Sequence, residues 1–66
     1  MEIAEIVRKR REMLHMTQAE LAIRSNMSRQ SIIALEATGE CRLSSLLRIA
    51  QTLDLKLSLE PYGDDG

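Results

Sequence analysis

The sequence predicts a small, mainly α domain of four to five helices that ends in a single β-strand. Apolar residues recur at helical spacing as far as Leu53, which predicts the helices. Thr17 and Ser28 stand where two of these helices would need an N-cap. After Leu53 the pattern changes to strict alternation of apolar and polar residues, which predicts the strand. We therefore divide the chain into a helical domain, a strand and a disordered acidic tail, at residues 1–54, 55–61 and 62–66.

The composition suits a helical core built from aliphatic side chains. The 66 residues include one Tyr and neither Phe nor Trp, so Leu, Ile, Met and Ala must fill the core. A core of this size is marginally stable, and dimerisation is a common remedy. The net charge of -1 argues against a general polyanion binder, but positive charge is concentrated at residues 8–11 and at Arg24, Arg29 and Arg42.

The side chains that enzymes and metal sites require are isolated from one another. His15 and Cys41 lie far apart and lack companions with zinc spacing. No nucleophile–base pair and no phosphate-binding loop can be identified, so we expect no enzyme activity, no metal and no cofactor. A single aromatic residue also disfavours RNA binding, which usually needs several aromatic side chains for base stacking. A single Cys and no apolar run of signal or membrane length predict a cytoplasmic protein.

The first expected helix covers about residues 2–14. Ile3, Ile6 and Val7 begin an apolar pattern at helical spacing, and the last turn of this helix is basic. We interpret His15, which follows it, as a turn residue.

A helix, a tight turn and a second helix are expected next. Thr17 and Glu20 fit a capping box, which predicts a helix over about 18–25. Asn26 follows at the point where the chain must turn, and Asn tolerates the left-handed backbone conformation.

The second helix of this pair is expected over about 28–38. Ser28 is its predicted N-cap, and Gly39 is its predicted left-handed C-cap. The arrangement leaves the N-terminus of the helix exposed, where it could enter a groove.

The last helix and the strand are both rich in leucine. The helix is expected to be capped near Leu43-Ser44 and to end at Leu53. One strand cannot exist alone, so the same strand of a second copy would complete an antiparallel ribbon across a two-fold axis. An extension of the helix or a loose apolar tail is the alternative. The leucines expected to cover the dimer core are Leu55, Leu57 and Leu59.

Residues 3–53 resemble the helix-turn-helix domain of the Cro/C1 repressor family, also called the XRE family. The resemblance depends on TQAELA from Thr17, on SRQSI from Ser28 and on Leu35-Glu36. The chain departs from the family at His15 and Asn26, where Gly is frequent. A short domain followed by a leucine-alternating strand further resembles HipB-type antitoxins, in which the C-terminal strands of two subunits form a β-lid over the dimer.

The resemblance implies a set of DNA contacts. Gln can pair bidentately with adenine and Arg with guanine, each worth about 1–3 kcal/mol of discrimination, and an Ala methyl can contact a thymine methyl. The implied base-reading residues are Ser28, Arg29, Gln30, Ser31 and Ala34. The implied phosphate contacts are Thr17, Gln18, Thr38 and Arg42. Arg11 and Glu36 are implied to form a buried, structural ion pair.

The sequence therefore predicts a homodimeric, sequence-specific repressor that binds a palindromic operator in double-stranded DNA. The HipB-like architecture adds the hypothesis that the protein is an autoregulating antitoxin whose partner is a HipA-like toxin kinase. The alternative is a stand-alone phage-type or chromosomal regulator with no toxin partner. We expect no association with membranes.

Overall fold

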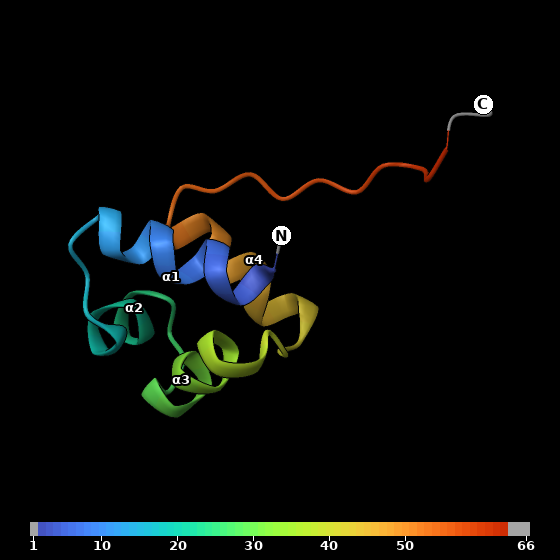
Figure 1. Ribbon diagram of the computed structural model, residues 1–66. Helices are drawn as coiled ribbons and strands as arrows, with labels where there is room; N and C mark the ends of the chain where they lie inside the picture. Colours follow the sequence, from blue (N-terminus) through green and yellow to red (C-terminus); the bar gives the residue numbers. More distant parts are fainter. Residues whose placement is uncertain (1, 64–66) are drawn as a thin grey trace.

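The computed structural model describes residues 2–63, and within that range the chain forms four helices and no strand (Figure 1). None of these helices combines the length and hydrophobicity that crossing a membrane requires. Most of the expected acidic tail, residues 64–66, lies outside the described residues. The helices are α1 (Ile3–Met13), α2 (Gln18–Arg24), α3 (Arg29–Thr38) and α4 (Leu43–Thr52). The prediction of a mainly α domain is thus confirmed.

The helices enclose one aliphatic core. α3 packs against both α1 and α2, and α2 also contacts α4. Every helix contributes an apolar side chain, which fits a chain without Phe or Trp. The core residues are Val7, Leu21, Ala22, Ile32, Leu35, Ile49 and Leu53.

Two of the three predicted N-caps are present. The Thr17 hydroxyl accepts the Glu20 N–H at 3.0 Å, and the Glu20 carboxylate accepts the Thr17 N–H at 2.8 Å. The Ser28 hydroxyl accepts the N–H of Ser31 at 3.1 Å. The prediction of a cap near Leu43-Ser44 is wrong. The N-cap of α4 is Arg42, whose carbonyl accepts the Leu46 N–H at 3.0 Å. The Arg42 side chain makes no capping bond.

Three helices end in the same backbone motif, a Schellman turn. The chain turns at a residue other than Gly whose φ is 58°, in the left-handed region, and the N–H of the next residue then bonds back to a carbonyl in the last turn. The left-handed residues are His15, Asn26 and Asp54. The closing bonds run from Met16 to Arg11 (3.1 Å), from Met27 to Ala22 (2.8 Å) and from Leu55 to Ala50 (2.8 Å).

These turns also supply apolar side chains to the core. Met16, Met27 and Leu55, the residues directly after the three turns, are the partly buried side chains that pack against the core cluster. Each turn thus ends one helix and seats the next segment on the core. α3 differs, because it ends at Gly39 (φ 80°) with a bond to the Leu35 carbonyl at 2.7 Å, as its predicted C-cap requires.

The segment after α4 is extended and leaves the helical body (Figure 1). The alternative in which the last helix continues into this segment is wrong, because α4 ends at Thr52 and Asp54 turns the backbone into the left-handed region. Residues 55–61 form no strand with the rest of the described chain. Their pairing with a second copy therefore stays a prediction.

His15→Gly should stabilise the fold. A left-handed L-residue costs about 1–2 kcal/mol, and the greater freedom of Gly in the unfolded chain offsets part of the relief. We expect a net gain of about 0.5–1 kcal/mol, measured as a higher midpoint of thermal unfolding. His15→Ala keeps the strained Cβ and serves as the control. A midpoint for His15→Gly no higher than that of His15→Ala would contradict the assignment.

Candidate nucleic-acid interface

Two hydrogen bonds connect the turn between α2 and α3 to α4. The buried Ser25 hydroxyl bonds to the Thr52 hydroxyl at 3.1 Å, and the Arg48 guanidinium donates to the Asn26 carbonyl at 3.3 Å. The left-handed Asn26 reverses the chain at this point. α2 and α3 therefore form a helix-turn-helix unit whose turn is held from α4.

α3 buries one side and exposes the other. Ile32 and Leu35 are completely buried. Arg29 and Gln30, in the first turn, are exposed, and neither side chain makes a hydrogen bond within residues 2–63. Their donors and acceptors are available to an external partner.

Ser28 and Ser31 are engaged with each other. Their hydroxyl oxygens lie 2.9 Å apart, in addition to the N-cap bond from Ser31 to the Ser28 oxygen. One hydroxyl hydrogen satisfies this contact, so the pair retains one hydrogen to donate to a base or a phosphate. The structure therefore places these two predicted residues at the start of α3 as one polar unit.

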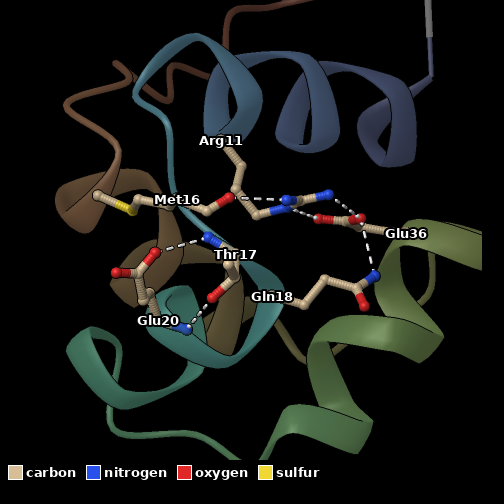
Figure 2. Close-up of polar contacts among 6 residues, drawn as sticks. All are labelled: Arg11, Met16, Thr17, Gln18, Glu20 and Glu36. Carbon is tan, nitrogen blue, oxygen red and sulfur yellow. Dashed lines mark hydrogen bonds and ion pairs between the residues drawn. The ribbon is translucent and has the colours of Figure 1, made fainter.

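A buried ion pair joins α1 to α3 (Figure 2). The Arg11 guanidinium donates twice to the Glu36 carboxylate, at 2.7 and 3.0 Å, and once to the Met16 carbonyl at 2.8 Å. The two side chains are only 10% and 6% exposed. The hydrogen bond to Glu36 raises the pKa of Arg11 against the opposing effect of burial, so the guanidinium stays charged. This is the pair that the family resemblance implies.

Gln18 completes the same network. Its side-chain amide donates to Glu36 Oε1 at 3.1 Å, which connects the first residue of α2 to α3 (Figure 2). One amide hydrogen is left over for a phosphate oxygen. The family resemblance implies the phosphate contact, but it does not imply the contact with Glu36. Only the distance between the folded helices reveals the second role.

Two of the predicted phosphate contacts, Thr38 and Arg42, lie on the α3–α4 side and differ in what they can donate. The Thr38 hydroxyl donates to the Ala34 carbonyl at 2.9 Å and accepts the Glu40 N–H at 3.1 Å, so its only hydrogen is used inside the helix end. The Arg42 guanidinium is exposed. It borders an open hollow of about 420 Å³.

This hollow adjoins the exposed face of α3. Its lining includes Ser31 and Ala34 from α3 and Cys41 and Arg42 from the loop. Partial burial raises the pKa of the Cys41 thiol, so it stays protonated at neutral pH. The hollow thus offers hydroxyl and guanidinium donors beside the Glu40 carboxylate, without a reactive thiolate.

Two features escaped the sequence analysis. Arg10, interpreted as part of a basic helix end, donates to the Leu53 carbonyl at 2.8 Å and so binds the C-terminus of α4. No local pattern could identify a partner 43 residues away. Ile33 is 41% exposed on α3. Its spacing of three residues from Gln30 could have assigned it to the exposed face.

Comparison with known proteins agrees with this geometry. A family model described as helix-turn-helix matches residues 7–59, which is more than half of the chain and includes all four helices from the second turn of α1 onward. No curated protein matches the chain.

Removing one partner of the buried ion pair should be strongly destabilising. Arg11→Met leaves the Glu36 charge without its cation, which typically costs about 3–5 kcal/mol. The double variant Arg11→Met/Glu36→Leu removes both charges and should recover a large part of that loss. Urea denaturation at equilibrium measures both. A loss of less than about 1 kcal/mol in Arg11→Met would show that the pair is not needed for stability.

Proposed function

The chain belongs to the Cro/C1-type helix-turn-helix family of DNA-binding transcriptional regulators, and on this premise we propose that it is a homodimeric repressor of a palindromic operator. The observation that supports sequence-specific reading is the exposed first turn of α3. Arg29 and Gln30 make no hydrogen bond there within the described chain. Such a helix N-terminus enters the major groove in this class of motif.

The chemistry of the first turn suits base recognition. A guanidinium can donate twice to guanine O6 and N7, and a Gln amide can both donate to and accept from adenine. Ala34 lies one turn after Gln30 and is exposed, so its methyl group could approach a thymine. In the proposed complex, Arg29 and Gln30 provide most of the discrimination between bases.

Contacts with phosphates would set the position of α3 in the groove. Gln18 is held by Glu36 and keeps one amide hydrogen, and Thr17 keeps its hydroxyl hydrogen. Arg42 would supply a full charge from the other end of the unit. Thr38 contributes as a donor only if its bond to Ala34 is exchanged for one to a phosphate. The net charge of -1 predicts weak non-specific binding, because the ten acidic side chains offset the nine basic ones.

Selection of bound duplexes from a random DNA pool tests the reading residues. The wild type should enrich a palindrome whose half-sites lie about ten base pairs apart. Gln30→Ala should lose about 1–3 kcal/mol of preference at one or two positions of each half-site and keep its non-specific affinity. Gln51→Ala, an exposed Gln on α4, is the matched control. Identical selected sequences for wild type and Gln30→Ala would exclude Gln30 as a reader.

Dimerisation through the C-terminal segment is proposed from its apolar face. A groove of about 120 Å³ lies between α1, α4 and the start of the segment, and its lining is almost entirely apolar. Leu55 is partly buried, Leu57 is 39% exposed and Leu59 is 86% exposed. The solvent exposure of the leucines thus increases along the segment, from Leu55 to Leu59. A second copy that pairs its segment with this one would bury them.

Leu57→Lys should convert the dimer into a monomer, because it places a charge in the proposed leucine face. Light scattering measures the oligomeric state. Loss of two-site binding should lower operator affinity by a factor of about 10² or more. Ser58→Lys adds the same charge on the opposite side of the strand and should leave the dimer intact. A Leu57→Lys variant that stays dimeric would refute the ribbon.

An antitoxin role is the second candidate function. Its support is the leucine-alternating segment after a short DNA-binding domain, an architecture that resembles HipB-type antitoxins, together with the acidic end of the sequence. In that case a HipA-like kinase should co-purify with the tagged protein from a lysate of its host. Recovery of the dimer with its operator but without a kinase would favour a stand-alone regulator.

A further inference from the structure

The exposed face of α3 changes its chemistry after the first turn. Gln30, Ile33, Ala34 and Ala37 follow the spacing that places side chains along one stripe of a helix. Ile33 is 41% exposed, and both alanines are exposed, whereas Ile32 and Leu35 on the opposite side are completely buried. The stripe therefore begins with an amide and continues with apolar groups only.

This apolar continuation cannot read bases through hydrogen bonds. The last polar side chain of the first turn is that of Ser31, whose hydroxyl is already engaged with Ser28. The base edges of the major groove carry one apolar group among their donors and acceptors, the C5-methyl of thymine. The exposed side chain of Ile33, next to Ala34, matches that group in chemistry and in shape.

We propose that Ile33, together with Ala34, contacts the C5-methyl group of a thymine and thereby recognises this base. Ile33 is then a specificity-determining residue. This inference rests on the proposed function, and it adds the base class that the second turn of α3 recognises. The occupant of the apolar stripe is DNA because the stripe continues the face that carries Gln30, the residue proposed to read bases. 5-Methylcytosine carries the same methyl group at C5. At these positions it should therefore partly replace thymine.

The experiment uses the duplex that the wild-type protein selects from a random pool. Each thymine of one half-site is replaced in turn by uracil, which lacks only the C5-methyl group, and dissociation constants are measured at fixed salt. At one or two positions the replacement should weaken wild-type binding about fourfold, the amount expected from one buried methyl group. Ile33→Ala should bind the thymine and uracil duplexes with nearly equal affinity at those positions.

Ile23→Ala is the matched control. Ile23 is 78% exposed on α2 and lies outside the stripe, so its variant should keep the full preference for thymine over uracil. Both substitutions shorten an exposed Ile to the residue with the highest helix propensity, so the fold should be retained. Circular dichroism checks this for both variants.

The outcomes separate this inference from the function on which it rests. Equal binding of thymine and uracil duplexes by the wild type would overturn the inference while DNA reading stands. Undiminished thymine preference in Ile33→Ala would overturn the assignment to Ile33. A folded protein that enriches no DNA sequence would instead overturn the proposed function, and with it the premise of this inference. A thymine preference that Ile33→Ala removes and Ile23→Ala keeps would support it.

Discussion

The contact between Arg11 and Glu36 is the interaction on which the arrangement of the first three helices depends. Two charges lie in the interior, and each oxygen of Glu36 accepts a bond from the guanidinium. The third guanidinium bond holds the Met16 carbonyl in the α1–α2 connection, and Gln18 reaches the same carboxylate from α2. No buried side-chain nitrogen or oxygen lacks a partner among residues 2–63. Such a network specifies one orientation of α2 relative to α3, because other orientations would leave a buried charge without its partner.

The helix ends also place apolar side chains on the core, which a chain without Phe or Trp requires. A core of small aliphatic groups needs every available apolar side chain, and the Schellman turns bring Met16, Met27 and Leu55 onto it. After the turn at Asp54, Leu55 packs against the core, and the rest of the last segment extends away from the helical body (Figure 1). One local backbone motif therefore closes the core and presents the surface proposed for a second copy.

Most of the helical framework could be predicted from the sequence, because its signals are local. Capping side chains, a terminal Gly and apolar spacing act within a few residues, so Thr17, Ser28 and Gly39 mark the ends of α2 and α3 correctly. The start of α4 was misjudged because its N-cap, Arg42, caps through its backbone alone and carries no side-chain signal. For the site, residue type and family resemblance indicated the first turn of α3, since exposure and chemistry there follow from helix spacing.

The sequence by itself thus determined where the helices lie and which face of each is apolar, and through the family resemblance it indicated which side chains are candidates for reading DNA. The tertiary structure alone decided which distant groups meet: Gln18 with Glu36, Arg10 with the Leu53 carbonyl and Arg48 with the turn at Asn26. These contacts depend on the packing of whole helices, and no short-range pattern encodes that packing. The proposed β-pairing of residues 55–61 depends on quaternary structure. A strand gains its hydrogen bonds from a partner strand, and here the proposed partner belongs to another chain.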